Sequence, residues 1–245
     1  MSSTLMQNEY TDSFDFYNTR YENGIAPWHR PVVNWNLMKH YSNLAPEGEP
    51  LKKVLVPLCG KTCDIKYLAD KGHVTVGVEF CERPCREIFE RDQIDYTEKT
   101  VPEIEGKLFE SKDGKIKVYC CDFFKFGPEI EGQFEAVWES GAQIEFDDRM
   151  KYYDQMKLLT APGCRWLTGL YQYDLSIYNG IPYSVPHEQL VNKLGDDFDI
   201  VSVEKKTFSV GDEEASHGNA KMMINFLRMH NLKTIDDHAY VFIKK

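Results

Sequence analysis

The sequence predicts an α/β protein with a doubly wound, mostly parallel sheet of seven strands that finishes in an antiparallel pair. The first observation is residues 52–80, KKVLVPLCGKTCDIKYLADKGHVTVGVEF, where an apolar run, a tight turn, an amphipathic segment and a second β-branched run follow one another. That order is typical of the βαβ unit of a parallel sheet. The second observation is that apolar runs and helical patterns keep alternating after residue 80, until extended segments close the chain.

The elements outside this unit follow from apolar periodicity and from turn residues. Helices are predicted over residues 31–41, 84–93, 147–159 and 188–194. Strands are predicted over residues 116–121, 134–138, 164–171, 198–210, 221–229 and 240–243, the last as an added edge strand. A polar hairpin starts at residues 107–110 and turns at Asp113 and Gly114, and the third helix is capped by Asp147 or Asp148.

Length, composition and charge describe one domain that binds small molecules. The chain has 245 residues with 42% hydrophobic content and no linker-like stretch, so residues 1–245 are expected to form a single domain. The formal net charge is -10, which disfavours a polyanionic partner because neutralising phosphates requires clustered Lys and Arg. We therefore expect a small-molecule substrate, no nucleic acid, and a monomer.

The chain ends and the cysteines point to the cytoplasm. The N-terminus, MSSTLMQNEYTDSFDF, lacks a basic region followed by an apolar core, and no stretch reaches the roughly 20 apolar residues of a membrane span. The seven cysteines are an odd number and fit reduced thiols better than a disulfide scaffold. Two CxxxC spacings, Cys59/Cys63 and Cys81/Cys85, are longer than zinc-knuckle CxxC loops, so no metal is expected.

The βαβ unit predicts a binding site for a nucleoside cofactor. Glu79 ends the second strand about 20 residues after the first turn, where a nucleotide-binding sheet places the carboxylate that accepts from the ribose hydroxyls. The turn has one glycine, Gly60, after Leu58 and Cys59, instead of the GxGxxG that a pyrophosphate requires. A single nucleoside with a small polar tail fits better, and S-adenosyl-L-methionine is the candidate. Leu58 and Gly60 would line its methionine end.

Two further strand ends should contribute to the same site. Asp122 and Phe123 follow the strand at 116–121, where a carboxylate can accept from the adenine amine and a backbone N–H can contact a ring nitrogen. The alternative for Asp122 is an N-cap or a loop aspartate, a common use of this residue. The strand at 134–138 ends before Ser140, which we expect to border the transferred methyl group.

Aromatic residues crowd the segment before the first strand. Phe14, Tyr17 and Tyr21 have helical spacing, so one interpretation is a helix packed on the core by an aromatic stripe. The other is that residues 14–41 form a lid over the cofactor, in which Tyr17, Tyr21 and Trp28 attract the sulfonium and exclude water. The sequence alone leaves both interpretations open.

Three motifs resemble the thiopurine S-methyltransferase family: PLCGK at residues 57–61, the DIKYLADKGHVTVGVE that follows the next two residues, and YCCDFF at 119–124. The resemblance extends over about residues 14–226. It implies the class I methyltransferase fold, S-adenosyl-L-methionine as cofactor, an N-terminal segment that covers it, and the adenine role of Asp122 and Phe123. That family carries two arginines that face the acceptor. This chain has Ser140 at the first of these positions and no arginine at the second, which falls near Glu213.

The predicted activity is methyl transfer to a small molecule, with thiol sulfur as the expected acceptor atom. A sulfonium is already activated, so the protein must align the reactants and exclude water, and no catalytic triad is required. His187 is a better candidate base than His73, although both fit a structural role. A halide or inorganic-sulfur methyltransferase and a non-catalytic cofactor-binding protein remain alternatives, whereas the missing GxGxxG argues against a nicotinamide oxidoreductase.

Overall fold

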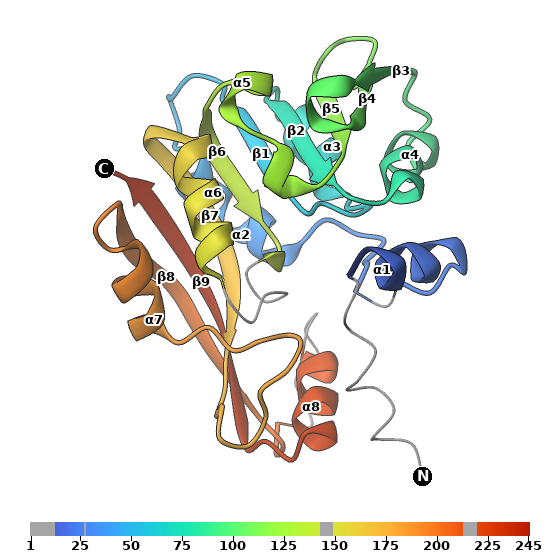
Figure 1. Ribbon diagram of the computed structural model, residues 1–245. Coiled ribbons are helices and arrows are strands. Elements are labelled where there is room, and N and C mark those ends of the chain that lie inside the picture. The colour runs from blue at the N-terminus through green and yellow to red at the C-terminus, as the bar shows by residue number, and fades with distance from the viewer. Residues whose placement is uncertain (1–12, 27, 143–148, 213–219) are drawn as a thin grey trace. The chain divides into compact units, whose positions relative to one another are not determined.

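The computed structural model describes residues 13–26, 28–142, 149–212 and 220–245. These residues form two compact units, each built from two segments of the chain (Figure 1). The first unit contains the described part of Met1–Val33 together with Leu58–Phe126, and the second contains Asn34–Pro57 with Gly127–Lys245. Within the described ranges, no helix has the length and apolar character needed to cross a bilayer.

The first unit places two strand ends side by side. Its strands are β2 (Val74–Glu79), β3 (Tyr96–Val101), β4 (Gly106–Ser111) and β5 (Ile116–Cys120). Its helices are α1 (Ser13–Glu22), α3 (Asp64–Asp70) and α4 (Glu82–Arg91), with the short 3-10 turns η1 (Pro102–Ile104) and η2 (Phe123–Lys125). β2 and β5 run parallel with Glu79 opposite Cys120, and β4 pairs antiparallel with both β5 and β3. α3 and α4 pack on β2. The βαβ motif predicted for residues 52–80 is therefore correct for its helix and its second strand, which belong to this compact unit.

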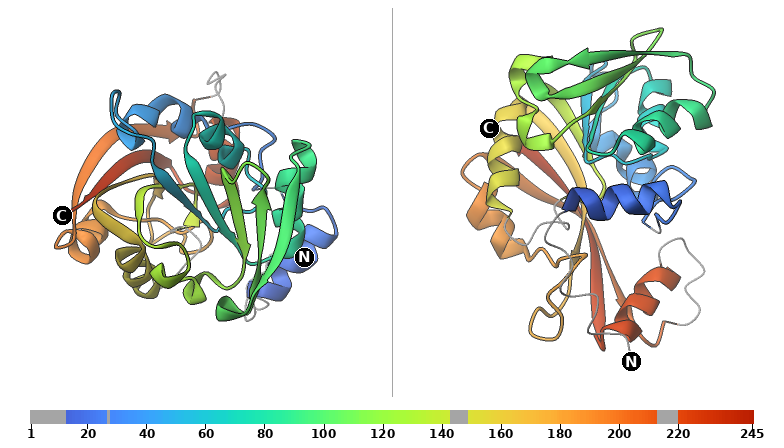
Figure 2. Two further views of the ribbon diagram at one scale, coloured as in Figure 1. Left: turned by 90° about the horizontal axis from the view of Figure 1, so that it is seen from above. Right: turned by 45° about the vertical axis from the view of Figure 1, so that its right-hand side comes forward.

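The second unit carries the rest of the sheet. Its strands are β1 (Lys53–Pro57), β6 (Phe134–Glu139), β7 (Thr160–Gln172), β8 (Phe198–Ser209) and β9 (Thr234–Lys244). Its helices are α2 (Trp35–Leu44), α5 (Pro128–Glu131), α6 (Met150–Leu159), α7 (His187–Leu194) and α8 (Ala220–Met229). β1, β6 and β7 are parallel, and β9 pairs antiparallel with β7 and β8. The left panel of Figure 2 shows α2 and α6 on opposite faces of these strands, as a doubly wound sheet requires.

The structure corrects three parts of the predicted strand pattern. The described residues form nine strands instead of seven, because β3 and β4 form an antiparallel pair that extends the sheet beside β5. Residues 221–229 belong to the helix α8, whose Met223 and Leu227 are four residues apart and pack into one apolar cluster. Residues 240–243 lie in β9, which is flanked by β7 and β8 and is therefore no edge strand.

The remaining boundaries agree with the predictions to within a few residues. The helix expected at 84–93 is α4, that at 31–41 is α2, and that at 188–194 is α7. The turn at Asp113 and Gly114 connects β4 to β5, and Gly114 has the positive φ of 70° that favours glycine. The predicted caps Asp147 and Asp148 lie outside the described residues, and α6 begins at Met150.

Candidate cofactor site

The loop after β1 turns sharply at Leu58 and Gly60. Both residues have positive φ angles, 46° and 52°, and the Cys59 N–H donates to the Val78 carbonyl oxygen at 3.0 Å, which ties the loop to β2. A Cβ on Gly60 would lie 2.5 Å from His29 Cε1 and 2.8 Å from the Tyr21 hydroxyl oxygen. Glycine is therefore required at position 60 for its backbone angle and because two side chains approach it closely.

Glu79 anchors this loop from the end of β2. Its side chain is buried, with the residue 7% exposed. Oε2 accepts from the Gly60 N–H at 2.9 Å, and Oε1 accepts from the Phe80 and Cys81 N–H groups, both at 2.8 Å. Burial raises the pKa of Glu79, and these three N–H donors oppose that rise. A carboxylate offers about four acceptor positions; the three N–H groups take three of them, and the Cys81 thiol, a weak donor, also hydrogen-bonds to this side chain.

The aromatic segment forms one connected cluster beside the loop. The rings of Tyr17 and Tyr21 pack edge to face on the ring of Trp28, with centroids 5.4 Å and 5.8 Å apart. The indole N–H of Trp28 donates to the Tyr21 hydroxyl at 3.3 Å. Tyr21 is buried while Trp28 is 41% exposed. The aromatic residues are thus partly in the core and partly at the surface. Tyr21 contacts Gly60, so the cluster lies against the loop that is predicted to bind the cofactor.

His29 is a site residue that the sequence reasoning missed. Its Nε2 accepts from the Lys61 N–H at 3.1 Å and lies 3.0 Å from the Tyr21 hydroxyl oxygen. Burial, together with the nearby Lys61 ammonium, lowers the pKa of His29 to about 4. A signal was present, because His29 follows Trp28 inside the aromatic segment.

The two histidines that the sequence singled out do not join this cluster. His73 is buried just before β2. His187 begins α7 in the second unit, where its ring stacks on Tyr240 with the centroids 5.8 Å apart. Neither geometry indicates a catalytic base.

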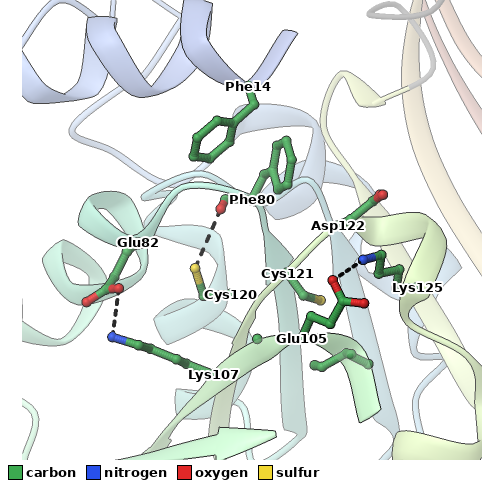
Figure 3. Close-up of a pocket in the computed structure, with 11 residues that line it drawn as sticks. Phe14, Phe80, Glu82, Glu105, Lys107, Cys120, Cys121, Asp122 and Lys125 are labelled. Atoms are coloured by element: carbon green, nitrogen blue, oxygen red, sulfur yellow. Dashed lines mark hydrogen bonds and ion pairs between the residues drawn. The ribbon is translucent and has the colours of Figure 1, made fainter. Parts of the chain in front are cut away.

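Asp122 caps the short turn after β5. Its Oδ1 accepts from the Phe124 N–H at 2.9 Å, so the N-cap interpretation is correct. Asp122 also lines a cavity of about 310 Å³ in the first unit. Figure 3 shows Phe14 and Phe80 at one end of this cavity, with Cys120, Cys121 and Asp122 nearby. The rings of Phe14 and Phe80 pack edge to face with centroids 4.5 Å apart. The capping bond leaves Oδ2 available, and an adenine contact remains a prediction.

Phe123 and Ser140 are held by neighbouring protein groups. The Phe123 side chain is buried, so only its backbone could contact a ligand. Ser140 follows β6 in the second unit, where its Oγ accepts from Asn34 Nδ2 at 2.9 Å. Asn34 in turn caps α2 by accepting from the Asn36 N–H. The structure thus gathers Tyr17, Tyr21, Trp28, Leu58, Gly60 and Glu79 with Asp122 and Phe123 in one unit, while Ser140 belongs to the other.

Comparisons with known proteins agree on one family. The family model for thiopurine S-methyltransferase matches residues 13–232. A probable thiopurine S-methyltransferase from Danio rerio is 36% identical over 182 residues, which are 73% of this chain and 78% of that protein. The thiopurine S-methyltransferase of Panthera tigris is 33% identical over 207 residues, covering 83% of this chain and 84% of that protein.

Solved structures with the same fold are methyltransferases. The 1,6-didemethyltoxoflavin-N1-methyltransferase of Burkholderia thailandensis, bound to 1,6-didemethyltoxoflavin and S-adenosylhomocysteine, aligns with a TM-score of 0.60 and 14% identity over 95% of this chain and 87% of that chain. The magnesium protoporphyrin IX methyltransferase of Synechocystis, with bound S-adenosylhomocysteine, aligns with a TM-score of 0.59 and 13% identity over 96% of this chain and all of the other. These likenesses confirm the class I fold predicted from the strand pattern.

Proposed function

Because the chain belongs to the thiopurine S-methyltransferase family, we propose that it methylates the sulfur of a small organic thiol whose binding needs no arginine at position 140. The chain is an S-adenosylmethionine-dependent methyltransferase. Thiopurines are the acceptors that the names of its relatives specify. The neutral Asn34–Ser140 hydrogen bond, at 2.9 Å, favours a different thiol, since it offers an anionic purine no cation.

The observation that supports a cofactor site most strongly is the buried Glu79 carboxylate. Its three backbone donors fix its position, and a ribose hydroxyl, a stronger donor than the Cys81 thiol, would donate to the same carboxylate. Asp122 would accept from the adenine amine through Oδ2, because Oδ1 is held by the Phe124 N–H. The backbone N–H of Phe123 would contact a ring nitrogen, as the sequence pattern suggests.

S-adenosylmethionine supplies, when bound, a sulfonium whose methyl carbon is open to displacement by a nucleophile. The chain's own residues would position the reactants and exclude water. The rings of Tyr17, Tyr21 and Trp28, which pack on one another, would attract the sulfonium through any π-face that it reaches, with about 0.5–2 kcal/mol for each contact. A position of Ser140 beside the transferred methyl group stays a prediction from the sequence. No base is assigned, because an aromatic thiol ionises near neutral pH without one.

A methyl-transfer screen with labelled cofactor tests this proposal. The panel contains thiopurines, aromatic thiols, aliphatic thiols, hydrosulfide and iodide. We expect turnover of organic thiols and weak turnover of thiopurines. Turnover confined to iodide or hydrosulfide would contradict the thiol assignment. Tight S-adenosylhomocysteine binding without turnover of any acceptor would instead indicate a non-catalytic protein.

The variant Ser140→Arg tests the role of position 140 directly. A charge-assisted hydrogen bond contributes about 1.5–3 kcal/mol, so we expect kcat/KM for anionic thiopurines to rise about 10- to 100-fold, with little change for neutral thiols. Ser140→Gln is the matched control, because it adds a long polar side chain without charge. An equal effect of both variants on thiopurines would contradict the argument from charge.

The cytoplasmic location and the monomeric state stay predictions.

A further inference from the structure

The four central backbone N–H groups of the loop between β1 and α3, those of residues 59–62, all donate to other groups of the protein. The Cys59 N–H donates to Val78, the Gly60 N–H to Glu79, the Lys61 N–H to His29 and the Thr62 N–H to the Cys59 carbonyl oxygen. A ligand carboxylate that reached this loop would therefore find no free backbone N–H at residues 59–62. Burying an anion without a donor is costly, so a donor outside residues 59–62 is needed.

His29 is placed to be that donor. Its Nε2 accepts from the Lys61 N–H, and a backbone nitrogen can only donate. In the neutral ring the proton must then sit on Nδ1. The Tyr21 hydroxyl oxygen lies 3.0 Å from the same Nε2 and accepts from the Trp28 indole N–H, so its own proton can share the Nε2 lone pair, which requires the same tautomer. No described residue bonds to Nδ1.

Burial and the charges around His29 keep its ring neutral. Burial is the main cause of its lowered pKa, about 4, and Lys61 and Arg91 act in the same direction, while Glu87 opposes them. At neutral pH the ring is therefore a neutral Nδ1–H donor. It cannot serve as a general base, because the only lone pair on its nitrogens accepts from the loop.

We propose that His29 is a positioning residue for the cofactor, and that its Nδ1–H donates to the α-carboxylate of the methionyl moiety. This inference rests on the proposed function, in which Leu58 and Gly60 line the methionine end. A carboxylate is the anion that this moiety carries, and the ring contacts Gly60 closely enough to exclude a Cβ there. The same contact would couple closure of the aromatic segment to recognition of the methionyl group.

Two substitutions separate the two nitrogens of the ring. His29→Gln keeps an acceptor for the Lys61 N–H near the Nε2 position and removes the donor at Nδ1. His29→Asn keeps a donor near the Nδ1 position and removes the contact with the loop. The ligands are S-adenosylhomocysteine and 5′-methylthioadenosine, which lacks the amino-acid moiety. Calorimetry gives the ratio of the two affinities for each protein.

We expect His29→Gln to lower the affinity for S-adenosylhomocysteine about 10- to 100-fold while the affinity for 5′-methylthioadenosine changes less than about twofold. His29→Asn should weaken both ligands and keep most of the wild-type ratio. A wild-type ratio in His29→Gln, together with a lost ratio in His29→Asn, would show that the ring only clamps the loop. If the wild type binds neither ligand, the proposed function itself fails, which is a distinct outcome.

A measurement on the wild type guards against a variant that does not fold. In NMR spectra of protein with isotope-labelled histidine, S-adenosylhomocysteine should shift the Nδ1–H resonance of His29, and 5′-methylthioadenosine should shift it much less. Equal shifts with both ligands, or no shift with either bound ligand, would overturn the proposal.

Discussion

Replacing Glu79 with glutamine should destabilise the protein even when no ligand is present. The carboxylate accepts three backbone N–H groups, and a glutamine oxygen can keep the two at Phe80 and Cys81. The amide NH₂ would then face the Gly60 N–H, so one buried donor loses its partner. That loss costs about 1–3 kcal/mol, which in a chain of this size lowers Tm by roughly 2–12 °C.

The magnitude is measured by thermal unfolding of the ligand-free protein, followed by circular dichroism. Glu90→Gln is the matched control, because Glu90 is exposed on α4 and its replacement should change the free energy of unfolding by less than about 0.5 kcal/mol. Glu79→Ala would leave three N–H groups unpaired, a loss of roughly 3–9 kcal/mol that approaches the whole stability of a typical domain. A Tm for Glu79→Gln within about 1 °C of the wild type would refute the anchoring role.

Two further predictions concern the aromatic segment. Gly60→Ala should displace His29 and weaken S-adenosylhomocysteine binding at least about tenfold in calorimetry, since the new Cβ would lie 2.5 Å from the ring. Gly114→Ala is the control: Gly114 has a similar positive φ but open space around it, so this variant should bind the ligand normally. Acidification should open the segment, because the open state takes up a proton below the ordinary pKa of 6.5 while the closed state resists until about 4. Closure should therefore be complete above pH 6.5 and about tenfold weaker at pH 5.5, and an NMR titration of His29 with a pKa near 6.5 would contradict this.

The sequence predicted well those features that depend on the order of residues along one strand and its next turn. Glu79 could be placed because a carboxylate at the end of β2 is set by strand periodicity. Its bonds to three backbone N–H groups could not be foreseen, because they depend on how the loop at Gly60 folds back onto β2. The cap at Asp122 was foreseen only as one of two alternatives, since capping and ligand binding use the same residue type.

The features that the sequence left out depend on tertiary contacts. His29 was missed because its importance comes from a bond to Lys61, 32 residues further along the chain, and its place directly after Trp28 does not reveal that bond. Residues 221–229 were assigned to a strand because the run is apolar, and short apolar runs do not distinguish a buried helix from a buried strand. In the structure, Met223 and Leu227 pack on one face of α8.

The most direct test of the central claim is a crystal structure of the protein with S-adenosylhomocysteine. We predict that a ribose hydroxyl donates to Glu79 Oε2, that the Gly60 N–H keeps its bond to the same oxygen, and that the methionyl carboxylate lies against His29. A bound ligand that makes no contact with Glu79 would contradict the claim that this buried carboxylate organises the cofactor site.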